Sequence, residues 1–134
     1  MNKKICIINA NYYKNISNNL LKGAFQVLDL KKITKVKIIN VPGVFEIPIV
    51  ISKNINKYDA FIALGCVIKG ETPHFKFISE ATIDALMQIS INKKKPIGNG
   101  VLTCLNLKQA LSRSDPNKKN KGGDFEFASS NELW

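Results

Sequence analysis

The chain has 134 residues, of which 45% are hydrophobic and 22% charged, and it carries a formal net charge of +10. This length predicts one domain, residues 1–134, that buries its core without disulfides or a metal, and no segment is long enough to span a membrane. Arginine occurs once, whereas Lys, Asn and Ile are plentiful, so we attribute most of the positive charge to coding bias.

Strand-like and helix-like patterns alternate along the whole chain. Short apolar runs predict strands at residues 4–9, 35–41, 60–68 and 97–105. Apolar residues at helical spacing predict helices at 16–30, 48–56, 73–91 and 107–114, with a further helix in the tail at 122–134. In the helix at 73–91, six apolar residues should face the sheet: Phe77, Ile78, Ala81, Ala85, Leu86 and Ile89. The alternation predicts a flavodoxin-like α/β fold, a three-layer α/β/α sandwich with a four-stranded parallel sheet.

The third strand leads into a turn that holds the only histidine of the chain. Thr72 is the expected N-cap and Pro73 the first helical residue, which places His74 in the first turn of the helix. Gly70 is expected to adopt the positive φ that lets backbone approach a ligand closely. Because a helix start offers free N–H groups to an anion, we predict a phosphate beside the histidine. The alternative is a surface histidine that merely follows a helix start.

Segments that follow parallel strands should meet at one edge of the sheet, here 11–13, 42–46, 69–74 and the residues from Asn106 onward. They would combine the Tyr12 ring, the Glu46 carboxylate and the histidine turn. This composition suits a polar heteroaromatic substrate with an anionic group. The alternatives are that Tyr12 is only an exposed turn residue, that Phe45 belongs to the core, and that Glu46 favours the positive end of the next helix.

Arg113 is the one basic residue for which lysine was not used. A guanidinium binds phosphate with a planar, two-pronged fork that an ammonium group cannot copy. Arg113 is therefore a candidate phosphate ligand, with an ordinary surface arginine as the alternative.

The three cysteines, Cys6, Cys66 and Cys104, lie in strand-like runs and lack metal-ligand spacing. We expect buried free thiols in a reducing compartment. A nucleophilic Cys66 near the turn is the less favoured alternative. The first apolar run is too short for a signal peptide, so we expect a cytoplasmic protein.

Several motifs occur together in one order: NANYY at 9–13, VPGVFEIP at 41–48, ALGCVIKGETPHF at 63–75, PIGNGVLT at 96–103, QALSRS at 109–114 and NKG at 120–122. Through them the chain resembles the 6,7-dimethyl-8-ribityllumazine synthase family. The resemblance implies a transferase-type condensation of 5-amino-6-(D-ribitylamino)uracil with 3,4-dihydroxy-2-butanone 4-phosphate, releasing phosphate and water. This is the penultimate step of riboflavin biosynthesis, and it implies neither cofactor nor metal.

The resemblance also implies roles for individual residues. Tyr12 would stack on the pyrimidine, His74 would transfer protons, and Arg113 would bind phosphate. The other substrate-binding positions form four groups: Val44, Phe45 and Glu46 around the ribityl chain; Val67 and Ile68 against the pyrimidine; the phosphate-binding turn Gly70, Glu71 and Thr72; and Asn99 with Lys121 near the pyrimidine.

The family's sites lie between subunits, so the resemblance implies a homo-oligomer in which Asn99, Arg113 and Lys121 come from the adjacent chain. A pentamer is the expected minimum, and a sixty-subunit shell is the larger alternative. The sequence begins at its first strand, without the N-terminal segment that adds to a neighbour's sheet in larger assemblies. Asn99 stands where many members have a second aromatic residue, and Tyr12 and Tyr13 where Phe and Asn are more usual.

Two other classes of function compete with this interpretation. A non-catalytic flavin- or nucleotide-binding module would need only Tyr12 and the phosphate turn, and the fold alone does not separate it from an enzyme. A basic RNA-binding protein is the third class. Because the lysines are scattered along the sequence without interleaved aromatics, we expect no specific nucleic-acid recognition.

Overall fold

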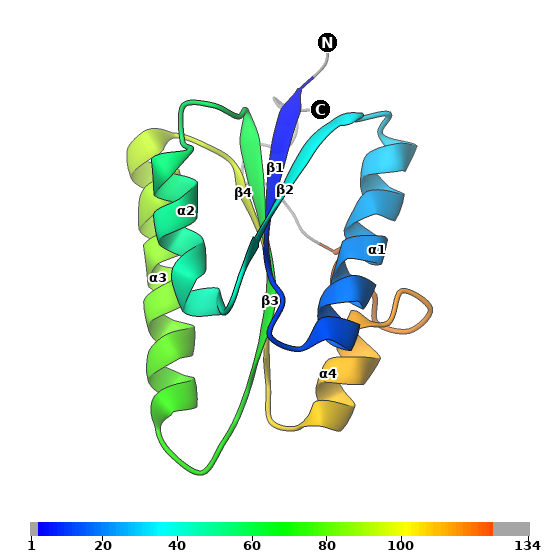
Figure 1. Ribbon diagram of the computed structural model, residues 1–134, viewed down its shortest axis with the longest axis vertical. Helices are drawn as coiled ribbons and strands as arrows, with labels where there is room; N and C mark the ends of the chain where they lie inside the picture. The colour runs from blue at the N-terminus through cyan, green and yellow to red at the C-terminus, as the bar shows by residue number, and fades with distance from the viewer. Residues whose placement is uncertain (1–2, 125–134) are drawn as a thin grey trace.

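The computed structural model describes residues 3–124, and Figure 1 shows a central sheet between two layers of helices. The strands are β1 (Lys4–Ala10), β2 (Lys35–Val41), β3 (Ala60–Ile68) and β4 (Ile97–Cys104). The helices are α1 (Lys14–Leu30), α2 (Ile47–Lys53), α3 (His74–Lys93) and α4 (Leu107–Ser114), with a single 3-10 turn, η1 (Val44–Glu46), directly before α2.

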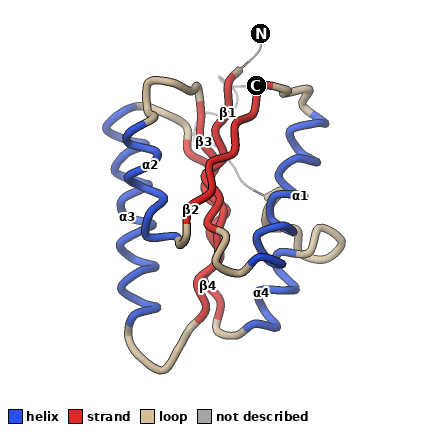
Figure 2. The backbone as a smooth tube through the Cα atoms, in the orientation of Figure 1, coloured by secondary structure: helices blue, strands red, loops and turns tan. Residues whose placement is uncertain are grey.

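All strand pairs in the sheet are parallel, and the strand order is β2-β1-β3-β4. The helices α1 and α4 cover one face of the sheet, whereas α2 and α3 cover the other (Figure 2). This arrangement confirms the predicted flavodoxin-like sandwich. Since all strands run in the same direction, every turn that leaves a strand lies at one end of the sheet and every strand start lies at the other.

The core has two halves, one on each face of the sheet, and β3 contributes to both. Residues of β3 are buried from Ala60 to Cys66, as the unbroken apolar run predicted for a strand covered on both faces. Alternate residues point to opposite faces, so Ile62 and Leu64 pack toward α1 while Phe61 and Ala63 pack toward α2 and α3.

The outer face of α3 differs from the prediction. Ile78, Ala85 and Ile89 are partly buried and Leu86 is buried, but Phe77 and Ala81, which were expected to face the sheet, are exposed. The apolar residues of α3 lie around several sides of the helix, and one chain provides packing partners for only one of those sides. The helix therefore leaves apolar side chains on the surface.

The turn between β3 and α3 corrects two details of the prediction. Pro73, not Thr72, occupies the N-cap position, and Thr72 Oγ1 accepts a long hydrogen bond of 3.4 Å from the His74 N–H. Gly70 does not have a positive φ; none of the glycines in residues 3–124 has one. Five residues separate the strand from the helix, so the chain reverses gradually and no left-handed residue is required.

The connection after α4 is held against α1. The Gly122 backbone approaches Leu20 so closely that a Cβ at this position would collide with the Leu20 backbone. Residues 122–124 are not helical, and the remainder of the helix expected at 122–134 lies outside the described residues. This close approach therefore fixes the position of the preceding residue, Lys121, on the surface.

Gly65 allows η1 to pack directly on β3. A Cβ at Gly65 would lie 2.6 Å from Val44 Cγ1 and 2.9 Å from Ala10 Cβ. Both distances are below normal contact, and the Ala10 Cβ has no rotamer with which to move away. The glycine therefore sets the spacing between the strand and the turn at 44–46.

We expect Gly65→Ala to lower the free energy of unfolding by about 1–3 kcal/mol, because overpacking forces these neighbours apart. Urea denaturation of the variant and the parent measures the difference. Gly70→Ala is the matched control, since nothing lies within 4 Å of a Cβ at Gly70, and it should change stability by less than about 0.5 kcal/mol. An equal effect of the two substitutions would contradict the packing argument.

Candidate active site

A pocket of about 630 Å³ opens where the turns after β1, β2 and β3 meet. Seven of the predicted site residues line it: Tyr12, Val44, Phe45, Glu46, Val67, Ile68 and His74. They come from four separate parts of the sequence, and the parallel sheet brings them to one edge. The segment from Asn106 onward, which was also expected to meet them, lines a separate hollow instead. Four further residues complete the lining: Tyr13, Gly43, Cys66 and Ile78.

Tyr12 presents its ring to solvent at one side of the pocket. Its side chain is 75% exposed, and its ring meets the Tyr13 ring edge to face, with centroids 4.9 Å apart and planes at 84°. Tyr13 is partly buried, and this burial raises the pKa of its phenol. The edge contact supports Tyr12 from one side while leaving its ring free to stack on a planar ligand.

A buried polar network lies beneath the turn that carries Tyr12. The Asn9 side-chain amide donates to Ser17 Oγ at 2.8 Å and to Asn40 Oδ1 at 3.0 Å. The Ser17 hydroxyl and Asn9 Oδ1 are also within hydrogen-bond distance, at 3.1 Å. These contacts join the end of β1 to α1 and β2, and they fix both ends of the Tyr12 turn. The sequence patterns did not predict these contacts, because Asn9 stood out only as the end of an apolar run and as part of the NANYY motif.

Glu46 holds its own turn in place. Its Oε1 accepts a hydrogen bond of 2.9 Å from the Gly43 N–H, while the Glu46 N–H donates to the Gly43 carbonyl at 3.2 Å, and the two bonds close η1. The carboxylate therefore has a structural partner as well as a position in the pocket wall. Val44 is buried against β3, but Phe45 is 62% exposed, so Phe45 is not the core residue that the alternative interpretation described.

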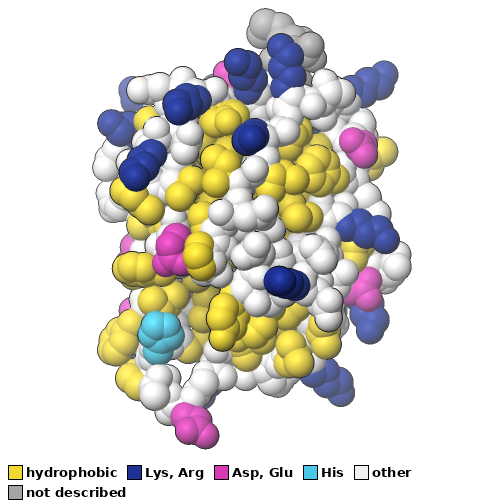
Figure 3. Space-filling view, viewed as in Figure 1, with side chains coloured by type: hydrophobic (Ala, Val, Ile, Leu, Met, Phe, Trp, Pro, Cys, Tyr) yellow, Lys and Arg dark blue, Asp and Glu magenta, His cyan; other side chains and the backbone are white. Residues whose placement is uncertain are grey.

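His74 begins α3 and lines the pocket from the first turn of this helix. Its side chain is exposed, and Ile78, one helical turn later, lines the same pocket. Figure 3 shows the histidine beside apolar side chains at the lower end of the molecule. Gly70, Glu71 and Thr72 do not line the pocket, but form the exposed turn that leads to His74.

Three predicted site residues lie elsewhere on the chain. Arg113 lines a separate hollow with Asn106, Lys108, Gln109, Ser112 and Lys119, and its Nη1 donates to Gln109 Oε1 at 3.1 Å. Lys121 is tied to Arg113 through the backbone, because its N–H donates to the Arg113 carbonyl at 2.8 Å. Asn99 lies within β4, where its Oδ1 accepts from the Val101 N–H at 3.0 Å. One chain therefore does not unite these residues with the pocket.

Neither a metal centre nor a membrane span is found among residues 3–124. No three His, Cys, Asp or Glu side chains gather there in a way that could hold a metal ion. None of the helices in this part of the chain combines the length and the apolar character needed to cross a bilayer.

The family model described as 6,7-dimethyl-8-ribityllumazine synthase matches residues 2–130. The chain is 44% identical to the 6,7-dimethyl-8-ribityllumazine synthase of Bartonella tribocorum over 128 residues, which cover 92% of this chain and 84% of the relative. It is 41% identical to the enzyme of the same name from Zymomonas mobilis over 123 residues, covering 90% and 87% of the two chains. The chain belongs to the 6,7-dimethyl-8-ribityllumazine synthase family. This finding confirms the resemblance inferred from the motifs.

The thiol in the pocket wall is not an activated nucleophile. Burial, with the neighbouring Cys104 as a lesser cause, raises the pKa of Cys66 to about 12, and burial raises the pKa of Cys6 to about 11. All three cysteines are free and buried, as expected. A thiol whose pKa lies well above the solution pH stays protonated, and only the thiolate attacks.

We therefore expect Cys6 and Cys66 to resist alkylation by iodoacetamide in the native protein at about pH 8, where a typical free thiol is partly ionised. Both should react once denaturant exposes them. Mass spectrometry of the labelled peptides measures the reaction at each position. Rapid labelling of Cys66 in the folded protein would contradict the assignment of this thiol as inert.

Proposed function

We propose that this chain forms 6,7-dimethyl-8-ribityllumazine in the pocket between Tyr12 and His74. Family membership supplies the reaction, in which the amine of 5-amino-6-(D-ribitylamino)uracil condenses with 3,4-dihydroxy-2-butanone 4-phosphate and phosphate and water leave. The observation that carries the assignment of the site is the convergence of Tyr12, the turn at 44–46 and His74 on one pocket.

The uracil substrate occupies the side of the pocket formed by Tyr12. The exposed Tyr12 ring stacks on the pyrimidine, and Val67 with Ile68 at the end of β3 contacts its edge. The ribityl chain lies along Val44, Phe45 and Glu46. One oxygen of the Glu46 carboxylate already accepts a hydrogen bond from the Gly43 N–H. The carboxylate can accept further hydrogen bonds, which suits the hydroxyl groups of the ribityl chain.

The phosphorylated substrate lies at the turn before α3. Gly70, Glu71 and Thr72 are exposed, and the open space around Gly70 lets a phosphate reach the backbone. The start of α3 faces the same region with unpaired N–H groups and a partial positive charge. This placement brings the carbonyl of the butanone next to the stacked uracil amine.

His74 then moves the protons of the reaction. Its side chain lines the pocket from the first turn of α3, beside the position assigned to phosphate. It accepts a proton released by the attacking amine and donates one as the phosphate departs. Holding the two substrates together supplies most of the acceleration, because proximity alone is worth more than one acid-base group.

Arg113, Lys121 and Asn99 complete the site from a neighbouring subunit. The separation of Arg113 from the pocket within one chain supports this arrangement, as does the shared backbone link that moves Arg113 and Lys121 together. An apolar groove of about 540 Å³ between α2 and α3, with the exposed Phe45 and Ile49 in its wall, offers surface for a second copy. A ring of identical contacts gives the pentamer that we propose as the minimal assembly.

The enzyme works as a single domain in the cytoplasm and takes no cofactor or metal. Three free, buried thiols suit a reducing compartment. The condensation requires only proton transfer and the loss of phosphate and water, and the pocket side chains suffice for these steps.

His74→Ala should lower turnover by about 10²- to 10⁴-fold while leaving measurable activity, because only the acid-base contribution is removed. Absorbance of the lumazine product, with both substrates and purified protein, gives the rate. Lys76→Ala is the control, an exposed residue of the same helix that does not line the pocket. Complete loss of activity in an intact assembly would contradict this division of labour, and absence of product from the parent would favour the non-catalytic module.

A shared site predicts complementation between two inactive variants. Tyr12→Ala removes the pocket half of a site and Arg113→Ala removes the half given to a neighbour. When the two chains assemble together at equal amounts, about a quarter of the sites regain both residues, since each site draws on two randomly placed subunits. Product formation by the mixed assembly tests this, with each variant alone as control. If both halves belonged to one chain, mixing would restore nothing.

A further inference from the structure

Lysines that are scattered along the sequence gather at one end of the folded chain. This end carries the starts of the strands and the ends of α1, α2 and α3, opposite the substrate pocket (Figure 1). More than half of the lysines belong to it: Lys3, Lys4, Lys31, Lys32, Lys35, Lys37, Lys53, Lys57, Lys93, Lys94 and Lys95. Figure 3 shows dark blue side chains concentrated toward the same end. Coding bias explains how many lysines there are, but not why they collect here.

Some of these lysines have an ordinary structural explanation. Lys31, Lys53 and Lys93 lie at the ends of helices, where a cation balances the partial negative charge and contributes about 0.3–1 kcal/mol. Lys35 and Lys37 also keep the edge strand β2 from pairing with other chains. Neither explanation covers Lys4, which lies on the inner strand β1.

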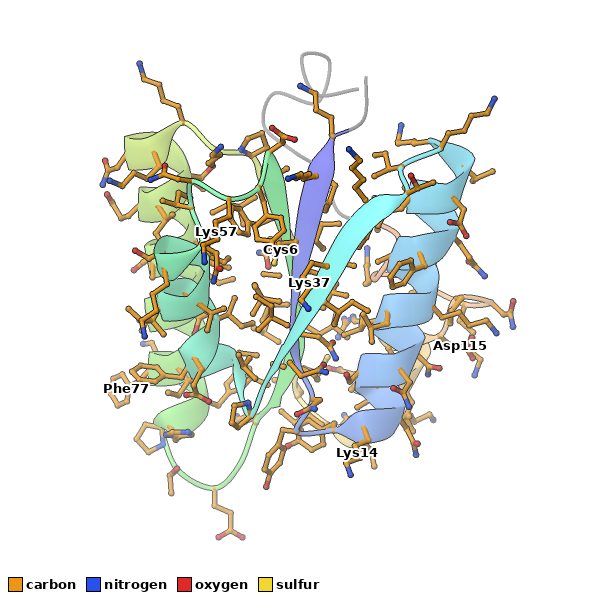
Figure 4. The ribbon with its side chains drawn as sticks, turned by 45° about the horizontal axis from the view of Figure 1, so that its top comes forward. Cys6, Lys14, Lys37, Lys57, Phe77 and Asp115 are labelled. Atoms are coloured by element: carbon orange, nitrogen blue, oxygen red, sulfur yellow. The ribbon has the colours of Figure 1, made fainter. Side chains whose placement is uncertain are left out.

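The strand lysines are placed against each other. Lys4 and Lys35 are direct partners in the register of β1 with β2, and Lys37 follows two residues later on the same face. Like charges opposite each other destabilise a sheet. Figure 4, in which this end is turned toward the viewer, shows Lys37 and Lys57 on the side of the sheet that α2 covers. We name Lys4, Lys35, Lys37 and Lys57 the lysine surface.

Within residues 3–124, the positive charge of the lysine surface is not balanced by ion pairs. Its four side chains are exposed, and none forms an ion pair with a carboxylate within residues 3–124. Asp59 is the nearest carboxylate in the sequence, and its Oδ2 accepts from the Lys4 backbone N–H at 2.7 Å. Asp29 is the other acidic residue that the described chain brings to this end. The surface therefore keeps a strong positive field that a polyanion would neutralise.

We propose that the lysine surface binds the phosphate backbone of nucleic acid without reading the base sequence. Lysine binds phosphate as a point charge without the geometric specificity of the arginine fork, which suits contacts to a repeating phosphate backbone. No aromatic ring stands free among the four lysines for base stacking, since the nearby Tyr58 packs edge to face on Phe61 with centroids 5.8 Å apart. Membrane docking would be favoured by apolar side chains interleaved with the lysines, but the exposed Leu30 and Ile91 of this end lie on α1 and α3 and not among the four lysines.

The test uses the intact assembly and a fluorescein-labelled single-stranded RNA of mixed sequence, followed by fluorescence anisotropy. Four phosphate contacts predict that affinity falls about fifty-fold between about 50 and 200 mM salt. In the variant with Lys4, Lys35, Lys37 and Lys57→Gln, affinity should fall and most of this salt dependence should disappear. The control variant has the same charge change at exposed lysines elsewhere, Lys14, Lys22, Lys76 and Lys118→Gln, and should keep the salt dependence of the parent.

Further comparisons keep the proposal open to failure. Lys57→Gln with Lys94→Gln avoids the strands, and should weaken RNA binding even if the four-residue variant does not fold. Equal weakening by the surface and control variants would overturn the proposal, because net charge alone would then explain binding. Poly-glutamate that binds as tightly as RNA, or anionic lipid vesicles that bind when RNA does not, would also overturn it. Product formation is not used as a readout, so the result is independent of the proposed active site.

Discussion

The parallel pairing of β1 with β3 is the constraint on which the rest of the molecule depends. Ile5 to Asn9 lie in register with Ala60 to Leu64, so both strands end at the same edge of the sheet. Tyr12 follows one strand by two residues and His74 begins the helix after the other. An antiparallel pairing would place these two side chains at opposite ends. The same pairing also gathers the strand starts, and with them the lysine surface, at the far end.

Short-range packing converts this topology into a shaped pocket. Gly65 lets Val44 settle against β3, and the Glu46 carboxylate closes the turn that Val44 begins. The buried amide of Asn9 fixes the neighbouring turn from below. Gly65, Glu46 and Asn9 shape the pocket whether or not they contact substrate, because each one determines where a contacting side chain lies. The pocket wall is thus mostly apolar, with a few polar groups held by the backbone.

Different contacts position the residues that each chain would contribute to the proposed site of its neighbour. Arg113 lies in the last turn of α4, and the connection after this helix returns to Arg113 through the Lys121 N–H and to α1 through Gly122. These contacts hold two cations on a surface that the pocket of the same chain does not reach. The family resemblance already implied that the two groups of residues belong to different subunits, but motifs along the sequence could not show how far apart the fold places them within one chain. Distance in space depends on which helix lies on which face, and that is a property of the whole packed domain.

By itself the sequence determined the elements of this protein and the chemistry of its turns. The unbroken apolar run at 60–68, and the alternation of strand-like and helix-like patterns around it, predicted the strands almost to the residue. A strand that is buried on both faces is apolar throughout, and this pattern can be seen in the sequence without knowing which strands pair with it. The motifs identified the family for the same reason, because they are local. Only the tertiary structure decided that Phe77 is exposed, that Gly70 needs no special backbone conformation, and that Cys66 and Ile78 join the pocket. It also decided that scattered lysines form one surface. Each of these depends on contacts between segments far apart in the chain, which local periodicity does not encode.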